Sequence, residues 1–322
     1  MEAIITGLIL GFFFGYVCQR GRFCMNSGFR DILMVRDFRI FKAFVLAVLI
    51  QMVAVNGLTA LGVFPIRQLP FLWVGNIVGG LVFGAGMVLA AGCASGTWYR
   101  IGEGMMGSFV AALGYIFAAF SARAGALSPI VKSVHRFSIS EPALYSLLDI
   151  NKWVLIVPSV VIGSAWLYRN SDIHPGQGWD WRKTGFGIGA AGIIAWWLST
   201  RTGRIYGLGI TAPSASIGEW FMTGGTTLLN WGTFFVIGIP LGALIASILK
   251  GEFKLRSPPA KRLPVQFIGG LGLGLGATLA VGCNIGGSVA GIPVLAAGNM
   301  LATGFFIVGN WIMVYLLFMR RW

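Results

Sequence analysis

The sequence predicts an all-α polytopic membrane protein with about nine transmembrane helices, arranged as an inverted 4+1+4 repeat with four re-entrant loops. Three observations support this prediction. First, 56% of the 322 residues are hydrophobic, 11% are charged and the mean hydropathy is +0.80, whereas a soluble domain carries about 25% charged residues. Second, nine apolar runs divide the chain, and third, one segment is duplicated. A soluble globule, a disordered chain and a fibrous repeat are therefore excluded.

The nine apolar runs approach the length that a helix needs to cross a bilayer, about 20 residues, and the shorter ones are typical of helices broken inside a protein. The polar stretches between them leave no room for a separate soluble domain, so we expect residues 1–322 to form a single transmembrane domain. The runs lie at about 3–17, 41–63, 71–91, 107–122, 152–168, 184–199, 231–249, 265–281 and 300–318.

An internal duplication relates the two halves of the chain. The segment from Gly79 to Gly96 aligns without a gap to the segment from Gly269 to Gly286, and ten of the eighteen positions are identical, including one cysteine and six glycines. The first repeat then spans about 1–125, a linking helix about 150–170 and the second repeat about 182–322. Because an odd number of crossings separates equivalent elements, the second repeat is expected to be inverted relative to the first.

Two further patterns accompany the duplication. A weaker echo pairs GRFC, from Gly21 to Cys24, with GRIY, from Gly203 to Tyr206. Four apolar runs also open with glycines four positions apart, a spacing that lets helix backbones pack closely in lipid. These pairs are Gly7/Gly11, Gly80/Gly84, Gly185/Gly189 and Gly270/Gly274.

The charge distribution predicts an orientation. The formal net charge is +14, but most cations flank apolar runs, so the expected partner is the lipid bilayer and we expect no nucleic acid to bind. The side that holds the C-terminus and the loops after runs 1, 3, 5 and 7 has 17 Lys and Arg, against 7 on the other side. The first side is therefore predicted to be cytoplasmic, with the N-terminus on the opposite, periplasmic side.

Four loops rich in Gly, Ser, Thr and Asn follow apolar runs and could enter the membrane. Such backbone is tolerated there only where protein surrounds it or it lines a polar cavity. Consecutive glycine N–H groups and inward-pointing helix ends favour an anion, with Arg22, Arg100 and Arg204 as either charge donors or interfacial anchors. The loops are CQRGRFCMNSGFRD, GCASGTWYRIGEG, TGRIYGLGITAPSAS and GCNIGGSVAGIP.

Cysteines in these loops indicate the kind of anion. Cys24, Cys93 and Cys283 each lie in a loop, whereas Cys18 lies one turn earlier, where a packing role is expected. A neutral thiol does not repel a dianion, and its weak S–H donor suits a polarisable sulfur acceptor. The sequence therefore predicts a sulfur-containing anion as the cargo, held weakly at successive sites.

The motifs QRGRFCMNSGFRD, AAGCASGTWYRIGEG, GRIYGLGITAPSAS and VGCNIGG occur in an order that resembles the YeeE/YedE family of sulfur-transport membrane proteins, in its thiosulfate-uptake branch. The resemblance implies a transporter, not an enzyme, in the bacterial inner membrane that imports thiosulfate through a relay of three cysteines. The relay positions match Cys24, Cys93 and Cys283. No cofactor or metal is implied. A cytoplasmic TusA-like sulfur carrier (YeeD/TsuB) is the implied protein partner.

Seven further residues in these motifs are expected to support the relay, namely Arg22, Gly92, Thr97, Arg100, Glu103, Gly282 and Asn284. Two roles stay open for Glu103, a structural partner for Arg100 or a proton-linked group, and the structural role is favoured. Related sequences can carry Ser after the third cysteine, and Asn284 keeps a hydrogen-bond donor at that position.

Three alternative functions remain. A selenium- or other sulfur-compound permease of the YedE branch would use the same thiols. A membrane thiol oxidoreductase or sulfurtransferase lacks a CxxC pair and a nearby base, because His135 and His174 lie in polar stretches. A Cu(I) channel would use thiols and Met25, but few methionines lie near Cys93 and Cys283.

Overall fold

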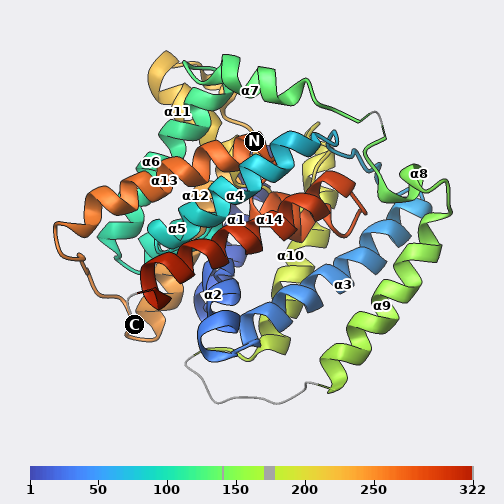
Figure 1. Ribbon diagram of the computed structural model, residues 1–322, viewed down its shortest axis with the longest axis horizontal. Helices are drawn as coiled ribbons and strands as arrows, with labels where there is room; N and C mark the ends of the chain where they lie inside the picture. The colour runs from blue at the N-terminus through green and yellow to red at the C-terminus, as the bar shows by residue number, and fades with distance from the viewer. Residues whose placement is uncertain (140, 170–177, 321–322) are drawn as a thin grey trace.

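The fold is entirely helical over residues 1–139, 141–169 and 178–320, which are the residues that the computed structural model describes (Figure 1). Only isolated β-bridges accompany the helices there. The helices are α1 (Glu2–Arg20), α2 (Met25–Val35), α3 (Arg39–Ala60), α4 (Trp73–Leu89), α5 (Ala94–Gly102), α6 (Met106–Arg123), α7 (Ser128–His135), α8 (Leu144–Leu147), α9 (Lys152–Arg169), α10 (Trp181–Arg201), α11 (Thr211–Thr223), η1 (Thr226–Leu228), α12 (Trp231–Leu249), α13 (Arg262–Leu279), η2 (Asn284–Val289), α14 (Ala297–Val314) and η3 (Tyr315–Met319).

Each of the nine apolar runs contributes a helix, although not all of them meet the same standard for a membrane span. In the described part of the chain, seven helical stretches are long and apolar enough to cross a bilayer. The other two runs form α9 and α10, which are helical but less apolar. The last residue of the predicted linking helix, residue 170, lies outside the described residues. Helix α9 lies at one edge of the molecule beside α3 (Figure 1).

The four predicted loops are partly helical, and three of them contain a short break followed by a short helix. Four residues separate α1 from α2, α4 from α5, and α13 from η2. The fourth loop is longer and joins α10 to α11. The helices that follow the breaks are short, and η2, a six-residue π-helix, is the shortest of them.

The duplicated glycines bring α4 and α13 together in antiparallel fashion. A Cβ at Gly79 would lie 2.6 Å from the carbonyl oxygen of Gly276, and one at Gly276 would lie 2.7 Å from the carbonyl oxygen of Gly79. At the other end of the contact, a Cβ at Gly86 would lie 3.0 Å from the carbonyl oxygen of Gly269. Side chains on these faces would force the two backbones apart, so glycine determines this close packing.

Four other pairs of helices, each with one helix from either half of the chain, also pack closely. Helix α1 packs against α12, as α10 packs against α3, and α6 packs against α13, as α14 packs against α4. A Cβ at Gly84 would collide with the carbonyl of Phe306, and one at Gly274 would collide with the carbonyl of Tyr115. The glycine pairs singled out in the sequence thus lie at helix contacts.

We expect Gly270→Ala to lower the melting temperature of the purified protein by several degrees, measured by its intrinsic fluorescence on heating. The added methyl group would overlap the carbonyl oxygen of Ala111, and overpacking of this kind costs about 1–3 kcal/mol. Gly304→Ala is the matched control, because no atom lies within 4 Å of the added Cβ. It should keep or raise the melting temperature, since alanine is favoured over glycine in a helix by about 1 kcal/mol. Equal melting temperatures for the two variants would contradict this packing.

Candidate functional site

The three cysteines predicted to form the relay share one local geometry. Each is the N-cap residue of the short helix that follows a break, and each comes two positions after a non-glycine residue with a left-handed backbone. That conformation costs about 1–2 kcal/mol for a residue with a Cβ, so the surrounding structure must hold each turn in place. The left-handed residues are Arg22 (φ 51°), Ala91 (φ 55°) and Val281 (φ 54°), which precede Cys24, Cys93 and Cys283 in that order.

Two of the thiols lie against each other in the core. The Sγ atoms of Cys24 and Cys93 are 3.6 Å apart, both side chains are fully buried and both thiols are free. Cys93 Sγ also accepts hydrogen bonds from the backbone N–H groups of Met25 and Gly96, each at 3.3 Å. The N-termini of α2 and α5 therefore converge on one sulfur atom, an arrangement that favours electron-rich ligands.

Glycine at position 96 makes this sulfur contact possible. A Cβ at Gly96 would lie 2.7 Å from Cys24 Sγ and 3.3 Å from Cys93 Sγ. At Gly286, the equivalent position in the second half, the nearest atoms to an added Cβ are 3.6 Å away. Tyr206, the counterpart of Cys24 in the GRFC/GRIY echo, contacts this position through its hydroxyl group, which donates to the carbonyl of Gly286 at 2.5 Å.

Cys283 lines a second region, a cavity of about 300 Å³ that also includes Arg123 and Arg204 and is called the Arg204 cavity below. Arg204 Nη1 donates to the carbonyl of Gly207 at 2.8 Å, and Arg123 Nη1 donates to Ser216 Oγ at 3.1 Å. Among the described residues, neither guanidinium forms an ion pair with a carboxylate. The cavity beside the thiol is therefore positively charged and suited to an anion.

Two polar side chains lie in this region, and the sequence predicts a supporting role for only one of them. Asn284, a predicted supporting residue, is fully buried, and both of its amide atoms lack a hydrogen-bond partner among the described residues. A buried amide that lacks a hydrogen-bond partner lowers the stability of the fold by about 1–3 kcal/mol. The amide of Asn284 is therefore available to a ligand. Tyr115, which the sequence did not single out, donates at 2.8 Å to the hydroxyl oxygen of Thr211, which lines the Arg204 cavity together with Cys283.

The other predicted supporting residues of these loops act on the backbone. Thr97 donates its hydroxyl to the carbonyl of Ala94 at 2.8 Å, so its proton is directed into the helix. Arg100 Nη1 donates to the carbonyl of Ala91 and holds the left-handed turn before Cys93. Gly92 and Gly282 lie in these turns, and a Cβ at Gly282 would approach Gly287 N to 3.0 Å.

Glu103 has a different ion-pair partner from the one considered in the sequence. Its Oε1 lies 2.6 Å from Arg22 Nη1, and among the described residues it forms no ion pair with Arg100. The sequence could not reveal this pair, because Arg22 and Glu103 are 81 positions apart. Arg22, Arg100 and Glu103 line a cavity of about 780 Å³, called the Arg22 cavity below.

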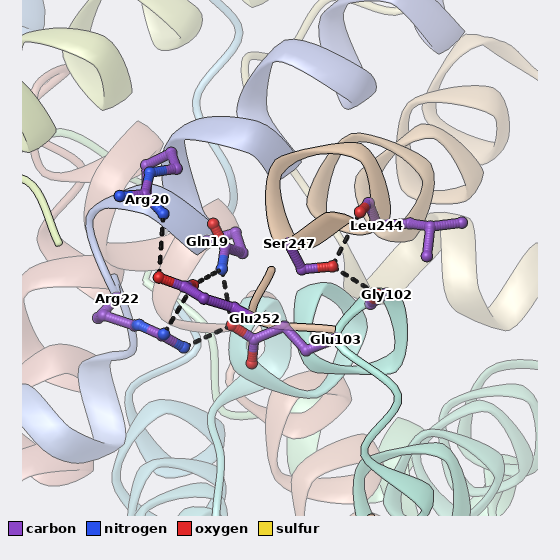
Figure 2. Close-up of polar contacts among 8 residues, drawn as sticks. All are labelled: Gln19, Arg20, Arg22, Gly102, Glu103, Leu244, Ser247 and Glu252. Carbon is purple, nitrogen blue, oxygen red and sulfur yellow. Dashed lines mark hydrogen bonds and ion pairs between the residues drawn. The ribbon is translucent and has the colours of Figure 1, made fainter. Parts of the chain in front are cut away.

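Three residues that the sequence missed complete this ion pair (Figure 2). Glu252 Oε2 lies 2.9 Å from Arg22 Nη2, and its Oε1 lies 3.3 Å from Arg20 Nη1. Gln19 Nε2 donates to both carboxylates, at 2.6 Å to Glu252 and 3.3 Å to Glu103. Two features of the sequence could have indicated these residues. Gln19 is a polar residue at the end of an apolar run, and Glu252 is an acid within the basic segment 250–262.

The two carboxylates of this cluster differ in their proton affinity. Burial raises the pKa of Glu103 above its usual value, and the charges of Arg22 and Arg100 offset this only in part. Partial burial also opposes ionisation of Glu252, but the hydrogen bond from Gln19 and the charge of Arg22 outweigh it and hold the pKa of Glu252 below its usual value. Glu103 is therefore the easier of the two to protonate.

Cys18 and His135 lie within helices, outside the breaks in the four loops that the sequence singled out. Cys18 is buried within α1. His135 Nε2 is 3.0 Å from the carbonyl oxygen of Leu279, and His174 lies outside the described residues. His135 is therefore engaged by backbone at the end of α13.

Known proteins are similar to this chain over nearly its whole length. A family described as "Sulphur transport" matches residues 20–312. A protein of Spirochaeta thermophila named "Thiosulfate transporter TsuA" is 40% identical and aligns over 98% of this chain and 100% of its own length. A protein of the same name from Escherichia coli is 33% identical over 98% of this chain and 95% of its own length. A "Probable transporter YedE" of Escherichia coli is 32% identical but covers 34% of this chain. With seven apolar helical stretches in its described part and a match over nearly its whole length, this multi-pass membrane protein belongs to the sulphur transport family.

Proposed function

We propose that this protein imports thiosulfate across the bacterial inner membrane by passing it along the thiols of Cys283, Cys93 and Cys24. The observation that carries the proposal is the buried Cys24–Cys93 pair, whose sulfur atoms are 3.6 Å apart beneath two converging helix N-termini. The names of the two relatives aligned over at least 95% of their lengths support thiosulfate as the cargo. Transport without covalent chemistry makes the protein a carrier and not an enzyme.

The two ends of the ion match the two kinds of group in the path. Thiosulfate has hard sulfonate oxygens at one end and a soft terminal sulfur at the other. Arginine and backbone N–H groups suit the oxygens, and neutral thiols offer weak S–H donors to the sulfur. In the Arg204 cavity, Arg123 and Arg204 attract the dianion and Cys283 receives its sulfur end. Weak contacts at successive thiols let the ion be held and then released.

The architecture that suits this path is a single transmembrane domain of nine crossings in a 4+1+4 inverted repeat, with four loops entering from the two faces. The reciprocal contacts of Gly79 with Gly276 and of Gly86 with Gly269 support it, because a two-fold axis relates each contact to the other. The pairing of α1 with α12 and of α10 with α3 follows the same relation. Helix α9 is the linking element.

The distribution of Lys and Arg predicts the direction of transport. The Arg22 cavity lies on the side with 17 cations, so it opens to the cytoplasm, and the Arg204 cavity opens to the periplasm. The N-terminus is then periplasmic and the C-terminus cytoplasmic. A TusA-like sulfur carrier would receive the ion on the cytoplasmic side.

Uptake of radiolabelled thiosulfate into vesicles containing the purified protein tests this function. We expect saturable uptake that unlabelled thiosulfate inhibits and sulfate does not, because sulfate has the same charge but no soft sulfur. Selenite and other sulfur anions serve as further competitors and distinguish a permease of broader range. Equal inhibition by sulfate, or uptake no greater than in protein-free vesicles, would contradict the proposal.

A further inference from the structure

The ion-pair cluster around Arg22 lies next in the path after Cys24, the last of the three thiols in the proposed order. Arg22 is two residues before Cys24, and one third of its side chain is exposed in the Arg22 cavity. Both ends of its guanidinium are occupied, Nη1 by Glu103 and Nη2 by Glu252. An anion that leaves Cys24 for this cavity therefore meets an arginine whose charge two carboxylates already neutralise.

The cluster also joins three separate parts of the fold (Figure 2). Arg22 follows α1, Glu103 follows α5 and Glu252 follows α12. Ser247 Oγ fastens α12 to α5 through the carbonyl of Gly102, at 3.4 Å. The packing of the helices thus sets the positions of the two carboxylates relative to Arg22. At these positions both carboxylates compete with an incoming anion for Arg22.

We propose that Glu103 is a proton-accepting counterion that competes with the transported anion for Arg22, so that binding of the anion in the Arg22 cavity takes up a proton. This inference rests on the proposed function. A dianion beside Arg22 repels an ionised Glu103, and protonation removes that repulsion and frees Nη1 for the anion. By linkage, the proton favours the anion to the same extent that the anion favours the proton.

The structure identifies Glu103, and not Glu252, as the group that takes the proton. The side chain of Glu103 is 9% exposed and that of Glu252 is 31% exposed, so burial penalises the charge on Glu103 more strongly. At the end of α1, Arg20 bonds Glu252, and Gln19 donates to Glu252 at 2.6 Å but to Glu103 only at 3.3 Å. Glu252 thus keeps its charge when Glu103 loses it.

The other charged groups around the cavity favour anion binding. Asp31 of α2 is an acid, but it pairs with Arg30 at 2.8 Å. The cations that line the cavity outnumber the acids, and Tyr99 of α5 is neutral in the range of interest. These cations are Arg39 at the start of α3, Arg100 of α5, and Lys254 and Arg256 after α12, in addition to Arg22.

The sign of the pH dependence follows from these charges. Below the pKa of Glu103 the carboxyl group is neutral, Nη1 of Arg22 is free and the anion binds. Above that pKa the carboxylate competes for Arg22 and affinity falls. One linked proton gives a slope of about tenfold in affinity per pH unit, and thiosulfate itself remains a dianion across this range.

Calorimetric titration of the purified wild-type protein with thiosulfate, in two buffers of different ionisation enthalpy, measures the proton directly. We expect proton uptake on binding and an affinity that falls by up to about tenfold per pH unit as pH rises. This measurement needs no variant. Binding without proton uptake at every pH would overturn the inference and leave thiosulfate transport intact, whereas no thiosulfate binding at any pH would overturn both.

Two variants assign the proton to one carboxyl group. Glu103→Gln should bind thiosulfate with an affinity that no longer depends on pH and without proton uptake, since glutamine keeps the shape and cannot ionise. Glu252→Gln is the matched control from the same cluster and should keep the proton uptake. Proton uptake that persists in Glu103→Gln, or that disappears only in Glu252→Gln, would overturn the assignment.

Discussion

We expect Cys93→Ala to reduce thiosulfate uptake to the level of protein-free vesicles while the protein still folds and reaches the membrane. The Cys93 sulfur atom receives both converging backbone N–H groups and contacts the Cys24 thiol. Alanine removes the centre of this arrangement, so no thiol remains there to hold the sulfur end of the ion. Growth of a sulfur auxotroph on thiosulfate, together with vesicle uptake, measures the effect.

Cys18→Ala is the control for this loss. Cys18 is equally buried and also free, but it lies within α1 and outside the predicted relay. We expect this variant to keep nearly normal uptake. Normal uptake by Cys93→Ala, or an equal loss in both variants, would show that a thiol at position 93 is not required for transport.

Gly96→Ala is expected to cause the second large loss of uptake, without removing any functional group. The added methyl group would lie 2.7 Å from Cys24 Sγ and 3.3 Å from Cys93 Sγ, so the two thiols must separate. A strain of about 1–3 kcal/mol at this contact corresponds to a loss of roughly 5- to 150-fold in binding. The initial rate of thiosulfate uptake, corrected for the amount of protein, checks this expectation.

The duplication supplies a matched control at Gly286. An added methyl group there would meet its nearest atoms at 3.6 Å, an ordinary van der Waals distance. Gly286→Ala should therefore keep most of the uptake. If both alanine variants transport equally well, the spacing of the thiol pair does not govern permeation.

Much of the fold could be predicted because it depends on local composition. The apolar runs gave the helices, and glycine pairs such as Gly80/Gly84 identified helix faces that lie against backbone in the structure. The weak echo between GRFC and GRIY also has a structural counterpart, since Tyr206 contacts Gly286 as Cys24 approaches Gly96. Positions that pack in the same way in the two halves of the chain keep similar residues, so they can be recognised from the sequence.

The sequence singled out individual residues of the candidate site but not the contacts among them. Cys24 and Cys93 were both singled out, yet their 3.6 Å contact joins positions 69 apart. Glu103 was recognised as unusual, but its ion pair depends on the way α1 and α5 meet. Glu252 was missed because a lone acid in a basic loop resembles a solvated surface charge until the fold places it beside Arg22.

The position of the bound ion tests the central claim most directly. Selenosulfate, in which selenium replaces the terminal sulfur of thiosulfate, would mark that atom by anomalous diffraction from crystals of the protein. We expect the selenium peak within van der Waals contact of the Sγ atom of Cys24, Cys93 or Cys283. Selenium peaks found only beside arginine side chains, away from all three thiols, would contradict a relay of cysteines.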